Sequence, residues 1–172
     1  MAKREVKFKD KMFPLVGPQL KVGDTAPDFA CVSASLEVTT LAATPKKTRF
    51  FSVVPSLDTP VCSQQTKKFD EALAAFKDKA ACFTFSLDMP FAQKRFCTAE
   101  NVVNMQSLSD LHNQSFGKNY GVLIEGLPMP LLSRAVFVVD KNNKITYCEY
   151  VPEVGAHPNY DNAIAAVKAT AQ

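Results

Sequence analysis

The sequence Pro55-Ser56-Leu57-Asp58-Thr59-Pro60-Val61-Cys62 joins two segments of different character. Before it, the apolar run Arg49–Val54 is typical of a buried strand. After it, residues 63–78 repeat apolar side chains at spacings of three and four, which predicts an amphipathic helix. The stretch is therefore a strand-to-helix junction, and Cys62 lies where the helix begins.

A cysteine at the start of a helix is well placed for chemistry. The unpaired N–H groups and the positive end of the helix dipole favour the thiolate, which is the nucleophilic form. Thr59, three residues earlier, can offer a hydroxyl to the sulfur, and Pro55 and Pro60 fix the backbone around it. Most cysteines are nevertheless small packing residues, so the junction alone leaves both interpretations open.

Length and composition indicate an ordinary globular protein. The chain has 172 residues, of which 47% are hydrophobic and 22% charged, with a net charge of +3. This composition fits one domain, residues 1–172, with a full core, and it excludes a disordered chain. Lysines and arginines form no patch with interleaved aromatic residues, so nucleic acid is not an expected partner.

No membrane or secretory segment is expected. No stretch approaches the roughly 18 uncharged apolar residues of a membrane span. The N-terminal residues 1–9 lack the apolar region of a secretory signal. We therefore expect a cytoplasmic protein without a membrane partner.

The five cysteines do not form a recognisable framework. Their number is odd, their spacings are irregular, and no Cys-x-x-Cys occurs, which argues against a thioredoxin-type dithiol and a zinc ribbon. His112 and His157 lie far from any cysteine in sequence, so we expect no metal site. Cys31 and Cys82 are expected to be core residues, while the sequence leaves the role of Cys148 open.

A second motif, Asp88-Met89-Pro90-Phe91-Ala92-Gln93-Lys94-Arg95-Phe96-Cys97, follows the first. The pattern Pro55-x-x-x-Thr59-x-x-Cys62 resembles the peroxidatic loop of the peroxiredoxins. The block that ends in Cys97 resembles the resolving-cysteine segment of the thiol peroxidase subfamily, the atypical two-cysteine peroxiredoxins. Weaker similarity to this subfamily covers nearly the whole chain.

The resemblance implies an antioxidant enzyme that reduces hydrogen peroxide and alkyl hydroperoxides. In this family the peroxide oxidises Cys62 to a sulfenic acid, which condenses with Cys97 to form an intramolecular disulfide. Thioredoxin then reduces the disulfide, and the cycle uses no cofactor. The resemblance also implies a homodimer packed near the active-site loop.

Three further side chains are candidates for the site. Arg134 opens an apolar strand and falls where the family carries its active-site arginine, and a guanidinium suits a thiolate and a developing negative charge. The resemblance implies that Thr59 hydrogen-bonds the sulfur and the peroxide, and that Pro55 shields the sulfenic acid from water. We also expect the helix starts near Cys62 and Cys97 to unwind partly when the disulfide forms.

The expected fold is α/β and thioredoxin-like, with a central mixed β-sheet flanked by helices and an N-terminal β-hairpin within residues 1–17. Residues 135–140 and 145–151 predict a second hairpin, and residues 160–171 predict a closing helix. Asp88 is expected to cap a short helix that carries Cys97. Residues 109–116 predict another helix, with Gly117 at its C-terminal end.

Two other functions remain open from the sequence. On the same fold, oxidation of Cys62 could pass a disulfide to a client protein, as in a peroxide sensor or disulfide relay. A thioredoxin-like interaction module without chemistry is the second alternative. The joint presence of the five residues argues against that module, because a packing-only domain has no use for such a set: Pro55, Thr59, Cys62, Cys97 and Arg134.

Overall fold

The computed structural model describes residues 3–172, and its main element is a mixed sheet of seven strands in the order β11-β10-β5-β6-β7-β3-β4. Strands β5, β6 and β7 are parallel, whereas β10 is antiparallel to β5. The expected mixed sheet is therefore confirmed. The strands are β3 (Ala30–Ser33), β4 (Val38–Thr40), β5 (Thr48–Val53), β6 (Ala80–Ser86), β7 (Gln106–Ser109), β10 (Ala135–Val139) and β11 (Ile145–Tyr150).

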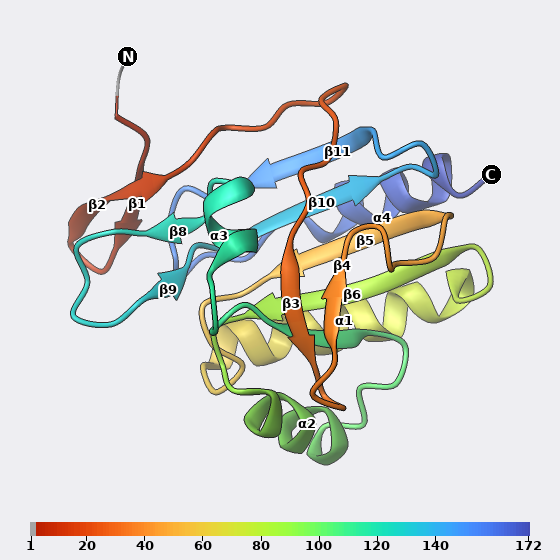
Figure 1. The fold of residues 1–172 in the computed structure, drawn as a ribbon, viewed down its shortest axis with the longest axis horizontal. Coiled ribbons are helices and arrows are strands. Elements are labelled where there is room, and N and C mark those ends of the chain that lie inside the picture. Colours follow the sequence, from red (N-terminus) through yellow and green to blue (C-terminus); the bar gives the residue numbers. More distant parts are fainter. Residues whose placement is uncertain (1–2) are drawn as a thin grey trace.

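Helices cover both faces of this sheet (Figure 1). On β5, Phe50 packs with the cluster under α1 and α4, while its neighbour Phe51 packs with the cluster under α3. This separation follows from the alternation of side chains along a strand. The helices are α1 (Pro60–Leu73), followed by a 3-10 turn η1 (Ala74–Phe76), α2 (Pro90–Ala99), α3 (Ser115–Asn119) and α4 (Tyr160–Thr170).

A smaller sheet of four strands contains the predicted N-terminal hairpin (Figure 1). Its strands are β1 (Glu5–Phe8), β2 (Lys11–Val16), β8 (Leu123–Ile124) and β9 (Leu131–Leu132). The hairpin is confirmed over β1 and β2, and residues 1–2 of the expected extension lie outside the described residues. Arg4 holds it near the main sheet, because its guanidinium lies 4.7 Å from the ring centroid of Tyr150 in β11 while Nη1 donates to the carbonyls of Pro18, at 2.8 Å, and Gly121, at 3.0 Å.

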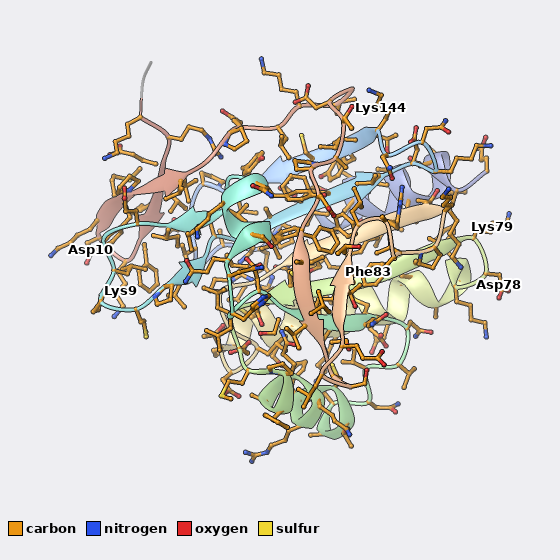
Figure 2. The ribbon with its side chains drawn as sticks, in the orientation of Figure 1. Lys9, Asp10, Asp78, Lys79, Phe83 and Lys144 are labelled. Carbon is orange, nitrogen blue, oxygen red and sulfur yellow. The ribbon has the colours of Figure 1, made fainter. Side chains whose placement is uncertain are left out.

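Aromatic rings fill the core under α3. Phe116 stacks on Phe85 at a centroid distance of 3.9 Å and on Tyr120 at 4.2 Å. Phe83 lies within the same cluster, whereas charged side chains such as Lys79 project outward (Figure 2). This core fixes the positions of β5, β6 and β10, whose ends carry the site described below.

Two local expectations are wrong in this region. Where a helix was expected from Ser109, residues Gln106–Ser109 form β7, which pairs parallel with β6. The helix α3 is limited to Ser115–Asn119 and contains Gly117 instead of ending at it. The glycine has a packing role, because a Cβ there would lie 2.7 Å from Leu132 Cδ2.

We predict that Phe116→Ala lowers the free energy of unfolding by about 3–5 kcal/mol, because it removes a fully buried ring that stacks on two others. Phe91→Ala is the matched control: its ring is 62% exposed, so the change should stay within about 0.5 kcal/mol. Urea unfolding of the three proteins measures both values. Equal losses in the two variants would contradict this description of the core.

Candidate active site

Three strand ends meet at one edge of the main sheet. Val53, the last residue of β5, lies opposite Ala135 of β10 and beside Phe85 of β6. Because β10 is antiparallel, its first residue lies at the same edge as the last residues of the parallel strands. The junction after β5, the segment after β6 and Arg134 are therefore brought together.

Cys62 is the third residue of α1 and is fully buried. Thr59 is the N-cap residue with an extended backbone, and Pro60 follows it, where its missing N–H costs no helix hydrogen bond. Cys62 packs with Val54 and Leu57, and the partly buried Phe96 packs against these three residues. The predicted strand-to-helix junction is confirmed.

Arg134 binds the sulfur directly. Its Nη2 donates a hydrogen bond to Cys62 Sγ at 3.3 Å, and the side chain is only 2% exposed. The same guanidinium donates from Nη2 at 2.8 Å and from Nε at 3.2 Å to the carbonyl of Val154. A charged donor held against a sulfur stabilises its thiolate form.

Gln65 completes the support of Arg134, and the sequence analysis did not find it. Its Oε1 accepts a hydrogen bond from Arg134 Nη1 at 2.8 Å, and its Nε2 donates to Ser52 Oγ at 2.8 Å. Gln65 is fully buried one turn after Cys62. A polar residue three positions after the cysteine, on the buried face of the helix, was the available signal.

Thr59 and Pro55 lie in the same junction with different surroundings. The Thr59 hydroxyl donates to the backbone carbonyl of Ser56 at 2.9 Å, and its side chain is exposed. Across residues 3–172, no hydrogen bond joins Thr59 to Cys62, so the hydroxyl has another partner than the one expected. Pro55 is buried.

Cys97 lies in α2 and is half-buried. It packs against the cluster that contains Phe69 and Leu73 of α1. Burial raises the pKa of the Cys97 thiol, an effect that a hydrogen bond with Ser107 opposes. Both Cys62 and Cys97 are free thiols, so the structure corresponds to the reduced protein.

The other three thiols are held in their neutral form. Burial raises the pKa of Cys82 to about 12. Burial also raises the pKa of Cys31, with a further contribution from the neighbouring carboxylate of Asp110, and it raises the pKa of Cys148. At neutral pH these thiols are poor nucleophiles, because the reactive species is the thiolate.

Asp88 does not cap α2, contrary to expectation. Met89 occupies the N-cap position, and no side chain caps the helix. The Asp88 carboxylate turns instead toward the Cys62 junction, where it accepts hydrogen bonds from Ser56 Oγ at 2.7 Å and from the Leu57 N–H at 2.8 Å. Tertiary partners outcompete the local cap here, because they offer two donors.

Within residues 3–172, no three His, Cys, Asp or Glu side chains come together as a metal site would require. The same residues contain no helix that is long and apolar enough to cross a membrane.

Comparison with known proteins places the chain in a family. The redoxin family model matches residues 21–164. A thiol peroxidase of Clostridium acetobutylicum is 48% identical over 165 residues, which cover 96% of this chain and 98% of that protein. A thiol peroxidase of Bacillus subtilis is 46% identical over 165 residues, which cover 96% and 97%. The chain belongs to the thiol peroxidases of the redoxin family.

Solved structures agree with this membership. The peroxiredoxin-like protein of Aquifex aeolicus superposes with a TM-score of 0.90 at 42% identity, covering 97% of each chain. The thiol peroxidase of Chromobacterium violaceum gives 0.86 at 21% identity, covering 96% of this chain and 95% of that one, and supports the fold alone. The predicted thioredoxin-like α/β fold is confirmed.

We predict that Arg134→Met slows alkylation of Cys62 by iodoacetamide at neutral pH by about tenfold or more, because the thiolate loses its charged donor. Gln65→Leu should have a smaller effect, since it leaves the guanidinium in place. Mass spectrometry of the labelled Cys62 peptide gives the rates.

Arg49→Met is the matched control for this alkylation experiment. Arg49 is as deeply buried as Arg134, but it binds Thr44, Asp140 and Asn143 and no cysteine. An equal slowing in both arginine variants would contradict a specific role of Arg134.

Proposed function

We propose that this redoxin-family enzyme is a thiol-dependent peroxidase that reduces hydrogen peroxide and alkyl hydroperoxides at Cys62. The observation that carries the proposal is the hydrogen bond from the Arg134 guanidinium to the buried sulfur of Cys62, at 3.3 Å. Peroxide reduction needs a thiolate and a positive group beside the leaving oxygen. One fixed guanidinium serves both requirements, because it stabilises the thiolate and provides the positive charge for the leaving oxygen.

In the first step, the Cys62 thiolate attacks one oxygen of the hydroperoxide. The O–O bond breaks, Cys62 becomes a sulfenic acid, and the second oxygen leaves as an alcohol or water after taking a proton. Arg134 stabilises the negative charge on the leaving oxygen. Thr59 hydrogen-bonds the peroxide after its hydroxyl turns away from Ser56, and the buried Pro55 shields the sulfenic acid from water.

In the second step, Cys97 condenses with the sulfenic acid and forms an intramolecular disulfide. The two cysteines occupy separate helices, and both are free thiols in the folded form. The start of α1 and part of α2 unwind so that the sulfurs can meet. Thioredoxin then reduces the disulfide through a mixed disulfide.

The assembly and the compartment complete the proposal. The enzyme works in the cytoplasm, where thiols are kept reduced, and acts as a homodimer packed near the active-site loop. The second candidate function, a peroxide sensor or disulfide relay, uses the same first step. It differs only in where the oxidising equivalent goes.

The direct test is thioredoxin-coupled peroxide consumption by the wild type, Cys62→Ser and Cys97→Ser. We expect both variants to lose steady-state turnover, because each lacks one sulfur of the cycle. Cys97→Ser should still consume about one equivalent of peroxide in a single burst, since Cys62 remains oxidisable.

Two outcomes would contradict parts of this cycle. Full turnover in Cys97→Ser would show that another thiol resolves Cys62, and Cys82→Ser and Cys148→Ser would then identify it. A burst without thioredoxin-dependent turnover in the wild type would favour the sensor.

We further predict that disulfide formation accelerates as the pH rises from about 8 to about 10, that is, through and above the ordinary pKa of a free cysteine thiol. Burial raises the pKa of Cys97 in the folded form, whereas the released thiol returns to an ordinary value of about 8.5. Between these two values the opened helix loses a proton that the folded helix keeps, so opening becomes more favourable as the pH rises. Quenched-flow mass spectrometry measures the rate.

The control for this pH profile is Cys82→Ala, which should keep the same dependence because Cys82 lies in β6 and takes no part in the step. A rate that stays constant across the range would contradict the effect of Cys97 burial.

A further inference from the structure

The segment after β6 makes contacts that the proposed chemistry does not use. Asp88 Oδ1 accepts a hydrogen bond from Ser56 Oγ, and Oδ2 accepts hydrogen bonds from the Leu57 N–H and from Ser86 Oγ. Ser56 and Leu57 belong to the Cys62 junction, whereas Asp88 lies two residues before α2, the helix of Cys97. One carboxylate therefore joins the segments of both cysteines.

A second part of the network attaches α2 to the sheet. Gln93 Nε2 donates to Ser86 Oγ at 3.0 Å and to the carbonyl of Leu108 at 3.1 Å. Ser109 Oγ donates to the Asp88 carbonyl. The Ser86 hydroxyl therefore donates to the Asp88 carboxylate and also accepts a hydrogen bond from Gln93 of the helix that carries Cys97.

Apolar burial contributes little to the attachment of α2. Gln93 is the one fully buried residue among residues 90–99, while Phe96 and Cys97 are half-buried and Phe91 is exposed. An element with few buried apolar side chains depends on its hydrogen bonds and opens at low cost. The hydrogen bonds of Asp88 and Gln93 are therefore a large part of what keeps α2 in place.

The far end of α2 is held separately. The Asp70 carboxylate, on α1, accepts hydrogen bonds from the N–H groups of three residues that follow α2, which are Val103, Asn104 and Met105. Cys97 lies between this anchor and the Asp88 network. Release of the Asp88 end alone would let α2 move while its other end stays attached.

We propose that Asp88 is a positioning residue that holds the Cys62 junction and the Cys97 helix in their folded arrangement, so that the two segments open as one unit. This inference rests on the proposed function. In the step concerned, Cys97 sulfur attacks the sulfenic sulfur of Cys62, the S–O bond breaks, the oxygen leaves as water with the thiol proton, and an S–S bond forms. Asp88 sets how readily the folded form, which favours attack on peroxide, gives way to the open form.

The first test is amide hydrogen exchange on the reduced protein, with Asp88→Asn and wild type. Replacing the carboxylate by an amide removes charge-assisted hydrogen bonds and places an NH2 group against donors, so exchange should rise about tenfold. We expect this rise in residues 55–64 and 90–99 together. A rise in one segment only, or in neither, would overturn the proposal.

Asp110→Asn is the matched control for the exchange experiment. Asp110 is a buried carboxylate that also accepts hydrogen bonds from two backbone N–H groups, those of Phe116 and Gly117, and from the Cys31 thiol, but its side chain has no hydrogen bond to residues 55–64 or 90–99. Its variant should raise exchange around α3 only. The same pattern in both variants would reduce Asp88 to a general contribution to stability and would overturn the proposal.

The second test measures how the Cys62 sulfenic acid is divided between disulfide and sulfinic acid. At a fixed excess of peroxide, Asp88→Asn should form disulfide faster and yield several-fold less sulfinic acid, because Cys97 is released more readily. Its rate of reaction with peroxide should fall. Asp110→Asn should leave the division unchanged, and an unchanged division in Asp88→Asn would overturn the proposal.

Ser56→Ala covers the case in which Asp88→Asn does not fold. It removes one donor to the carboxylate and leaves the Leu57 N–H in place, so it should shift exchange and product division in the same direction by a smaller factor. No shift in Ser56→Ala would overturn the proposal. If the wild type consumes no peroxide, the proposed function fails, whereas the exchange experiment still tests the coupling of the two segments.

Discussion

The contact between the Arg134 guanidinium and the Cys62 sulfur is the constraint on which the site depends. Both groups are almost fully buried, and a buried cation is costly unless its donors are used. Arg134 uses them on Val154, Gln65 and Cys62. These hydrogen bonds fix the guanidinium in one position, in which its Nη2 contacts the sulfur of Cys62.

Sheet register determines that this contact can form. Phe50 and Ser52 of β5, like Val136 and Val138 of β10, lie on the α1 face of the sheet, since they pack against or bind that helix. Arg134 continues the same alternation one step before β10. A shift of one residue in β10 would turn the guanidinium to the opposite face, because side chains alternate along a strand.

The sequence predicted the parts of the site that depend on local pattern. The junction at Cys62, the β10–β11 hairpin that follows Arg134 and the mixed sheet were predicted from periodicity and turn signals, and the structure confirms them. The role of Gln65 was missed because it depends on where Arg134 lies, which only tertiary structure shows. Asp88 was assigned to the wrong partner for the same reason: a cap is a local rule, and two donors from a distant loop overrode it.

Strand β7 shows a similar limit. The segment 106–109 is short and polar at three of its four positions, so no period distinguishes it from a loop or a helix end. Their strand geometry comes from pairing with β6 and β3, which lie far away in sequence. The missed strand matters for function, because the Leu108 carbonyl at its centre binds Gln93 of the Cys97 helix.

The two cysteine helices are attached to the sheet by different physical means. Helix α1 buries six side chains, among them the apolar Phe69 and Leu73, whereas α2 fully buries only the polar Gln93. Apolar burial holds an element over a range of small displacements, while hydrogen bonds fail within a fraction of an ångström. This difference in attachment suits the proposed cycle. The first step needs Arg134 and Cys62 in fixed positions, whereas the second step needs Cys97 to move. The body of α1 keeps the first site in place, and α2, held largely by polar contacts, can be released without disturbing the core beneath α3.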